Sequence, residues 1–193
     1  IIRKNKKNFI IKVLTTNNNI SLIYNQAIKY NVKNVVIINS KKFDKYKEKF
    51  KKKKINVFFN FNDLIKKIKK KVYYTINGIS GINGLEPSIK IIPFTKNIAI
   101  ANKESIICGW KFINKSLKLN NTQFIPIDSE HYSIWSLLKN ENLKNINKIY
   151  LTASGGPFLN KNMSNVKNTK TKHAIKHPNW KMGKKISIDS CTM

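Results

Sequence analysis

The sequence predicts an α/β protein with a mostly parallel sheet and helices on both faces. Two observations predict this fold class. Short apolar, β-branched runs alternate along the 193 residues with segments of helical periodicity, which is the pattern of βαβ units. The apolar runs are also continuous rather than alternating in polarity, which is typical of strands that are covered on both faces.

The first part of the chain gives four strands and three helices. FIIKVL at 9–14 predicts a strand, and apolar residues at helical spacing predict a helix over 20–30. A strand at 34–39 and a charged helix at 41–54 come next. The remaining elements are a strand at 56–59, a short helix at 63–70 and the strand VYYTI at 72–76.

The second part begins with a glycine-spaced turn, which leads into a helix over 85–92. NIAIA at 97–101 predicts a strand, and a helix follows at 103–118. QFIPI at 123–127, INKIYLT at 146–152 and KISID at 185–189 complete the strands. Because the alternation gives way to loop-rich sequence near 122–128, we expect one domain over 1–127 and the beginning of another over 128–193. Both ends of the chain read as cut from a longer protein.

The composition is strongly basic, with 38 Lys and Arg against 9 Asp and Glu and a net charge of +29. Such a charge favours a nucleic-acid partner, so a lysine-rich α/β nucleic-acid-binding domain is the alternative function. Arg3 is the one arginine, however, and arginine is the better ligand for phosphates and bases. No apolar run approaches the roughly 20 residues of a membrane span. Cys108 and Cys191 cannot make a disulfide scaffold.

Polar residues follow several of the predicted strands, where ligands bind in open parallel sheets. Gly78, Gly81 and Gly84 permit close approach to a phosphate or nucleotide, or form a plain turn. Lys103 at the start of a helix opposes the helix dipole, which favours a ligand-facing role. In an extended segment Asp128 and Glu130 point to the same side and suit Mg²⁺ or Mn²⁺. The alternative is an Asp N-cap with Glu in the first helical turn.

Three later segments offer further candidates. The hydroxyl of Ser154, beside two glycines, suits a phosphate, or the segment is a glycine turn. Residues 177–183 contain His, Trp and Met beside Pro and Gly, which is typical of a lid with an apolar face. The alternative is a Trp tucked into a local cluster. Ser190 follows the last predicted strand, where its hydroxyl is expected either to bind phosphate or to cap a helix. His131 is expected to pack against a neighbouring side chain or to orient it, rather than to bind a metal.

The order of these segments resembles the 1-deoxy-D-xylulose 5-phosphate reductoisomerase family. The matching motifs are NGISGINGLEPS, IAIANKES, PIDSEH, LTASGGPF and KHPNWKMGKKISIDSCTM, which lie within residues 77–193. The resemblance implies a Rossmann-like NADPH-binding domain followed by the start of an α+β catalytic domain. It implies an enzyme that converts 1-deoxy-D-xylulose 5-phosphate to 2-C-methyl-D-erythritol 4-phosphate with NADPH and Mn²⁺ or Mg²⁺. The five ordered motifs exclude another NAD-dependent dehydrogenase that shares only the fold.

The resemblance also implies roles for individual residues. Asp128 and Glu130 would be metal ligands and, with Lys103 and His177, the catalytic residues. The substrate-binding residues would be Lys103, Ser129, Glu130, Ser154, His177, Trp180, Met182 and Ser190. The cofactor-binding residues would be Asn17, Asn18, Asn19, Asn102, Glu104 and Gly183.

Several features depart from the family pattern. Its opening GSTGSIG phosphate loop, third carboxylate ligand and C-terminal helical domain are absent here, so we expect this chain to be inactive alone. Asn18 stands where the family has a basic residue near the adenosine 2′-phosphate, so Lys12 or another lysine would have to substitute. The resemblance implies a homodimer in the full-length protein and no nucleic-acid or membrane partner. We expect a cytoplasmic bacterial enzyme, with a plastid-type organelle as the alternative.

Overall fold

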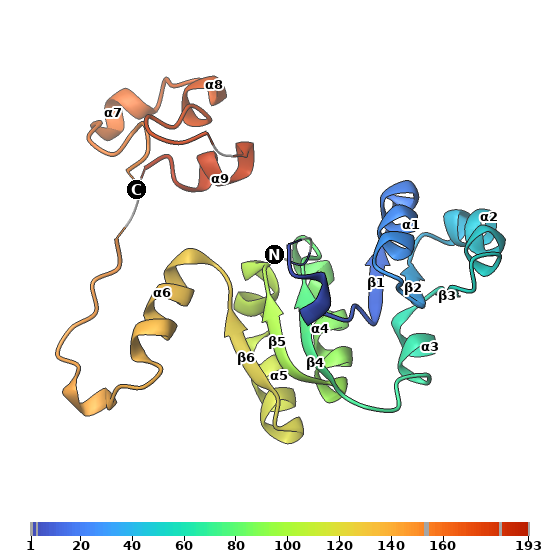
Figure 1. Cartoon of the computed structure of the whole chain (residues 1–193). Coiled ribbons are helices and arrows are strands. Elements are labelled where there is room, and N and C mark those ends of the chain that lie inside the picture. The colour runs from blue at the N-terminus through green and yellow to red at the C-terminus, as the bar shows by residue number, and fades with distance from the viewer. Residues whose placement is uncertain (1, 3, 153–154, 182, 193) are drawn as a thin grey trace. The chain divides into compact units, whose positions relative to one another are not determined.

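The computed structural model describes residues 2, 4–152, 155–181 and 183–192. The chain divides into two compact units, residues 1–132 and 133–193. The first unit contains all six described strands, in two parallel three-stranded sheets of order β1-β2-β3 and β4-β5-β6 (Figure 1). The strands are β1 Val13–Thr16, β2 Asn34–Ile37, β3 Asn56–Phe58, β4 Val72–Asn77, β5 Thr95–Ile100 and β6 Gln123–Pro126.

Helices connect successive strands in each sheet, as βαβ units require. They are α1 Ile20–Lys29, α2 Ser40–Lys51, α3 Phe61–Ile65, α4 Leu85–Ile91 and α5 Lys103–Asn120, with short 3₁₀ turns at Lys6–Asn8, Ile82–Gly84 and Ile92–Phe94. The helix α6, Ser129–Leu138, follows β6. This arrangement confirms the predicted α/β fold with parallel sheets, although the strands form two sheets rather than one.

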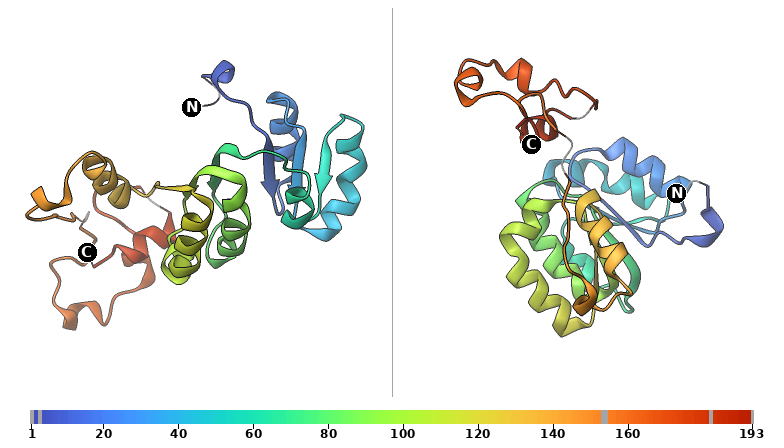
Figure 2. Two further views of the ribbon diagram at one scale, coloured as in Figure 1. Left: turned by 90° about the horizontal axis from the view of Figure 1, so that it is seen from below. Right: turned by 90° about the vertical axis from the view of Figure 1, so that its left-hand side faces the viewer.

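Each sheet has its own apolar core. In the first, Ile23 of α1 and Phe50 of α2 pack with Val35 of β2, and all three are buried. In the second, Ile113 of α5 packs with Ile98 and Ile100 of the central strand β5. Figures 1 and 2 show α4 and α5 along one face of this sheet. Burial of such side chains contributes roughly 1.5–3 kcal/mol each, which fixes the strands that carry the site.

The second unit is mostly irregular in its described part. It contains the 3₁₀ turn Leu143–Asn145 and the short helices α7 Met163–Val166, α8 Thr171–Ala174 and α9 Lys184–Asp189. Its most buried apolar side chain is Phe158, which is 5% exposed. No helix among the residues that the structure describes is long and apolar enough to cross a membrane.

Three strand predictions are wrong or misplaced. Residues 146–152 contain no strand, and 185–189 lie in α9. None of the described strands pairs with either segment, and an unpaired strand leaves its backbone polar groups without partners. In α9, an ion pair of 2.8 Å between Lys185 Nζ and Asp189 Oδ2 joins residues one helical turn apart. The first strand begins at Val13 rather than at residue 9, because its ladder with β2 begins there.

Candidate functional site

The carboxyl ends of the second sheet bring the predicted residues of the first unit to one edge. The ladder pairs Asn77 with Ile100, and Ile100 with Pro126, so β4, β5 and β6 end side by side. Three segments therefore leave the sheet at this edge: the loop 78–84, the start of α5 and the start of α6. Six predicted site residues lie on the last two segments: Asn102, Lys103, Glu104, Asp128, Ser129 and Glu130.

Asn102 caps α5 at this edge. Its Oδ1 accepts a hydrogen bond of 3.0 Å from the Ser105 N–H, and the side chain is buried. Its Nδ2 has no hydrogen-bond partner among the described residues, which costs about 1–3 kcal/mol for a buried donor. Lys103 and Glu104 form the first turn of α5, where the carboxylate agrees with the helix dipole and the exposed ammonium opposes it.

Asp128 is the N-cap residue of α6. The predicted extended segment at 128–130 is wrong, because α6 already begins at Ser129. The Asp128 Oδ1 accepts a hydrogen bond of 2.9 Å from the His131 N–H and lies 2.6 Å from His131 Nδ1. A capping side chain satisfies a backbone donor that has no partner within the helix. The capping alternative is therefore observed, and His131 orients the carboxylate as expected.

The pKa of Asp128 is lowered from its ordinary value. Partial burial acts in the opposite direction and raises the pKa, since it penalises the charged form. Hydrogen bonds from the backbone and ring of His131 to the carboxylate outweigh burial and lower the pKa. Asp128 is therefore ionised at neutral pH, as a ligand for a hard cation must be.

The donors at this edge suit a divalent cation only as part of an open site. Asp128 and Glu130 offer carboxylate oxygens, the donors that Mg²⁺ and Mn²⁺ prefer. In the described part of the chain, no group of three or more His, Cys, Asp and Glu side chains is placed to hold a metal ion. Two carboxylates leave most of an octahedral coordination shell to water, substrate or other protein groups.

The edge of the first sheet carries three more of the predicted cofactor residues, Asn17, Asn18 and Asn19. Asn19 caps α1 by accepting a hydrogen bond of 3.2 Å from the Leu22 N–H. Asn18 contacts two side chains at the start of α2: Asn39 Nδ2 donates to its Oδ1 at 3.1 Å, and Lys42 Nζ donates to its carbonyl at 2.8 Å. The lysine beside Asn18 is therefore Lys42. Asn17 precedes Asn18 in the exposed turn between β1 and α1.

The second unit holds the expected lid residues. His177 is 8% exposed, and its Nδ1 accepts hydrogen bonds from the Asn179 and Trp180 N–H groups at 3.2 and 3.1 Å. The ring thus organises the irregular segment that follows it. Trp180 is 61% exposed, so the alternative of a tucked Trp is wrong. Gly183 precedes α9 as its N-cap.

Two predicted phosphate segments meet within this unit. A Cβ on Gly156 would lie 2.1 Å from the Ser190 carbonyl oxygen and 2.4 Å from Cys191 Cα. The Phe158 N–H also donates to the Cys191 carbonyl at 2.8 Å. Ser190 donates its own hydroxyl to the Ile186 carbonyl at 2.9 Å, so it also ends α9. Ser154, Met182 and the side chain of Ser129 lie outside the described residues.

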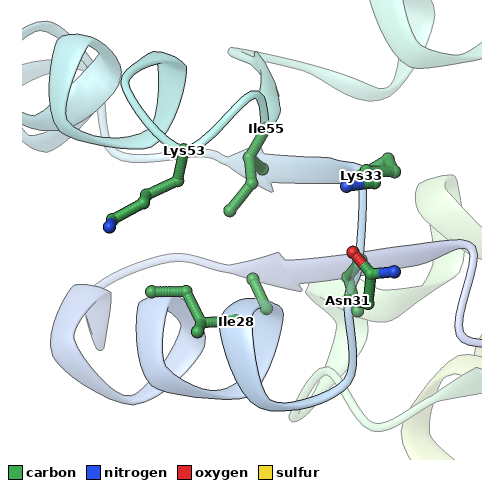
Figure 3. Close-up of a pocket in the computed structure, with 7 residues that line it drawn as sticks. Ile28, Asn31, Lys33, Lys53 and Ile55 are labelled. Carbon is green, nitrogen blue, oxygen red and sulfur yellow. The ribbon is translucent and has the colours of Figure 1, made fainter.

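A pocket of about 140 Å³ lies at the opposite edge of the first sheet, near the amino ends of β2 and β3 (Figure 3). It is lined by Ala27, Ile28, Asn31, Val32, Lys33, Lys53 and Ile55. None of the predicted site residues lines it. Parallel sheets bind ligands at the carboxyl edge, so this pocket is not a candidate for the predicted chemistry.

Sequence reasoning missed Asn77 and Ser88. Asn77 is 6% exposed and donates to Ser88 Oγ at 2.6 Å, and Ser88 is fully buried on α4. The position of Asn77, a polar residue at the end of an apolar strand, was the one sequence signal that could have pointed to it. The bond between the two side chains depends on packing that spacing does not reveal.

Comparison with known families identifies the chain. A family model described as 1-deoxy-D-xylulose 5-phosphate reductoisomerase matches residues 1–109, and the model of the C-terminal domain of that enzyme matches residues 124–193. The chain belongs to the 1-deoxy-D-xylulose 5-phosphate reductoisomerase family. The resemblance inferred from the five motifs is confirmed. The nucleic-acid-binding alternative has no support among the reductoisomerase relatives.

Curated reductoisomerases match along the whole chain. The reductoisomerase of Pelagibacter ubique (strain HTCC1062) is 51% identical over 195 residues, which are 100% of this chain and 50% of that protein. The reductoisomerase of Wolbachia pipientis subsp. Culex pipiens (strain wPip) is 42% identical over 194 residues, covering 100% of this chain and 49% of that protein. The chain thus spans about half the length of these relatives.

Solved reductoisomerase structures match the fold. The enzyme from Zymomonas mobilis in complex with NADPH gives a TM-score of 0.85 at 27% identity, over 98% of this chain and 49% of that one. A reductoisomerase in complex with NADPH, fosmidomycin and magnesium gives a TM-score of 0.79 at 28% identity. The match covers 99% of this chain and 50% of that one. These matches support a Rossmann-like α/β fold for the chain.

Proposed function

We propose that this chain is part of an enzyme that rearranges and reduces 1-deoxy-D-xylulose 5-phosphate to 2-C-methyl-D-erythritol 4-phosphate in non-mevalonate isoprenoid biosynthesis. Membership of the family supports the reaction, and solved relatives in complex with NADPH and magnesium support the two cofactors. The observation that carries the proposal is the meeting of segments 102–104 and 128–130 at adjoining strand ends. The segments that carry the ammonium of Lys103 and the carboxylates of Asp128 and Glu130 thus lie at one sheet edge, where ligands of parallel sheets bind.

Asp128 and Glu130 would hold the divalent cation, and Lys103 would contact the substrate. When bound, the cation supplies Lewis acidity toward the substrate carbonyl, and NADPH supplies the hydride. Asp128 keeps its negative charge at neutral pH because His131 hydrogen-bonds the carboxylate. The exposed ammonium of Lys103 at the start of α5 provides a cation for an anionic substrate.

The second unit would bind the rest of the substrate. Ser190, whose segment packs against Gly156, would offer its hydroxyl to a phosphate, and Ser154 would offer another. His177 would contact the substrate and orient the segment that carries Trp180. The exposed indole of Trp180 and the thioether of Met182 would cover the substrate as a lid, and Ser129 would add another substrate contact.

The dinucleotide would lie along the carboxyl edges of the sheets. Asn17, Asn18 and Asn19 would contact its adenosine end, and Asn102, Glu104 and Gly183 its nicotinamide end. Two domains, 1–127 and 128–193, would then divide cofactor binding from metal and substrate binding. A homodimer and a cytoplasmic location in the bacterium remain part of this proposal.

The test is an NADPH-oxidation assay on the full-length protein with 1-deoxy-D-xylulose 5-phosphate, with and without Mn²⁺. Asp128→Asn keeps a good N-cap but removes the charge. We expect turnover to fall roughly 100-fold or more, with unchanged NADPH affinity and only a small fall in Tm from the lost charge. Asp44→Asn, which removes an exposed carboxylate of α2, is the control and should retain turnover. Metal-independent turnover, or full activity of Asp128→Asn, would contradict the proposed metal site.

A further inference from the structure

A buried hydrogen-bond network fastens the loop 78–84 at the carboxyl edge of the second sheet. Asn77, the last residue of β4, uses its whole amide. Its Oδ1 accepts a hydrogen bond from the Ile79 N–H at 2.9 Å, and its Nδ2 donates to the Gly84 carbonyl at 2.8 Å and to Ser88 Oγ at 2.6 Å. One buried side chain therefore holds both ends of the loop.

Two serines complete the network. Ser88 of α4 donates its hydroxyl to the same Gly84 carbonyl at 2.8 Å. Ser105 of α5 donates its hydroxyl to the Gly81 carbonyl at 3.2 Å. The loop is thus held at its start, middle and end by groups from β4, α4 and α5, and such connected networks are rigid when every member is satisfied.

The loop has a packed side and an open side. A Cβ on Gly84 would lie 2.5 Å from Asn102 Nδ2, so this glycine is pressed against the capping amide of α5. A Cβ on Gly78 or Gly81 would meet no atom within 4 Å. Gly81 also has φ +68°, which side chains rarely adopt. A ligand that approaches the open side would therefore meet bare backbone.

The amide of Asn102 points independently to a ligand. It is 6% exposed, and its Nδ2 is the buried side-chain donor without a partner in the part of the chain that the structure describes. Buried polar groups in folded proteins are almost always hydrogen-bonded. An unsatisfied donor against the loop, at the edge where parallel sheets bind ligands, indicates that an acceptor arrives with the ligand.

We propose that Asn77 and Ser88 are positioning residues for the dinucleotide, an inference that rests on the proposed function. They keep Gly84 against Asn102 and hold Gly78 and Gly81 open toward the ligand. Neither side chain touches the dinucleotide in this proposal. They act through the backbone of the loop, so their loss changes cofactor affinity before it changes the binding of the sugar phosphate.

The experiment measures NADPH binding to the full-length protein by fluorescence titration without substrate. Asn77→Asp keeps the oxygen that accepts from the Ile79 N–H but removes the amide N–H groups that donate to the Gly84 carbonyl and to Ser88 Oγ. We expect the Kd for NADPH to rise roughly tenfold. The KM for 1-deoxy-D-xylulose 5-phosphate at saturating NADPH should stay unchanged. Ser88→Ala should raise the same Kd, and Ser88→Thr, which keeps the hydroxyl, should restore it.

Asn97→Asp is the matched control. Asn97 is 9% exposed on β5, and its Nδ2 donates to the Tyr73 carbonyl at 2.9 Å, away from the loop. This variant should lower Tm without raising the Kd for NADPH. If Asn77→Asp and Ser88→Ala lower Tm but leave the Kd unchanged, the two residues are merely structural and the inference is wrong. If the unaltered protein does not bind NADPH, the proposed function fails instead.

Discussion

At the scale of single residues, the same carboxylate of Asp128 caps α6 and has a lowered pKa. Its lowered pKa means that the folded state binds the proton of this carboxyl less tightly than the unfolded chain does. Asp128 therefore contributes stability above the ordinary pKa of an aspartate, and this contribution is lost as pH falls through the lowered folded value. The charge that suits the residue to a cation also strengthens the start of α6.

We predict that the stability difference between the unaltered chain and Asp128→Asn depends on pH. Without divalent metal, the unaltered chain should be more stable at pH 7, and the difference should shrink toward zero in acid as the carboxyl is protonated. Urea unfolding of both proteins across this pH range, with EDTA present, measures it. A difference that grows as the pH falls would mean that the hydrogen bonds of His131 do not favour the charged form.

The close packing of Gly156 leads to a second prediction, on the stability of the chain. A Cβ there meets the backbone of Ser190 and Cys191, which cannot move aside as a flexible side chain can. Gly156→Ala should destabilise the chain by about 1–3 kcal/mol or more in urea unfolding. Gly78→Ala, where a Cβ meets no atom within 4 Å, is the control and should stay within about 0.5 kcal/mol. Equal effects would show that the close packing of Gly156 against residues 190–191 contributes nothing to stability.

At the scale of elements, asparagine starts the helices. Asn19, Asn39, Asn60 and Asn102 each follow a strand and accept a hydrogen bond from a backbone N–H in the first turn of the next helix. Asparagine is among the best N-cap residues. These asparagines thus define where four helices begin, at the carboxyl ends of the preceding strands.

We predict that Asn39→Ala lowers the free energy of unfolding by about 1 kcal/mol, because the Lys42 N–H loses its acceptor. Asn39→Asp keeps the cap and should recover most of this loss, although it cannot donate to Asn18. The control is Asn62→Ala inside α3, where alanine is the better helix former. Urea unfolding of the three variants measures these differences in the free energy of unfolding. The capping role would be rejected if Asn39→Ala were no less stable than Asn62→Ala.

Local patterns predicted the elements that have strong periodicity. The helix expected at 103–118 is α5, Lys103–Asn120, because its apolar face packs on β5 at helical spacing. The segment 185–189 has the same short alternation as a strand but forms α9, since a strand also needs a neighbour. Alternation over five residues does not tell these outcomes apart.

The candidate site was predictable only where strand ends carry it. Asn102 and Asp128 were predicted as site residues because they lie two residues after the ends of β5 and β6. The capping hydrogen bonds of these residues depend on the residue at which each helix begins. Sequence patterns locate that residue only to within a few positions, which is why an extended segment was wrongly expected at 128–130. The bond between Asn77 and Ser88 joins a strand to a helix across a loop, so only the folded structure reveals it.

At the scale of the whole molecule, 38 Lys and Arg residues far outnumber the 9 Asp and Glu residues that could pair with them, which leaves a net charge of +29. The described residues include local ion pairs between lysine and a carboxylate, each three or four residues apart: Lys47–Asp44, Lys51–Glu48, Lys66–Asp63, Lys90–Glu86 and Lys185–Asp189. Exposed pairs of this kind contribute about 0–1 kcal/mol each. Repulsion among the many lysines is therefore the larger electrostatic effect on stability.

We predict that salt stabilises this chain. Raising NaCl from about 0.02 to 0.5 M shortens the Debye length from roughly 20 Å to about 4 Å, which screens lysine repulsion more than it weakens the local pairs. Thermal unfolding should show Tm rising with NaCl. The matched variant replaces Lys52, Lys53 and Lys54 with glutamine, which removes three charges from an exposed run after α2. Its Tm should be higher than that of the unaltered chain at low salt and respond less to NaCl. A Tm that falls with salt in both proteins would mean that the ion pairs, not the excess lysines, dominate the electrostatics of the fold.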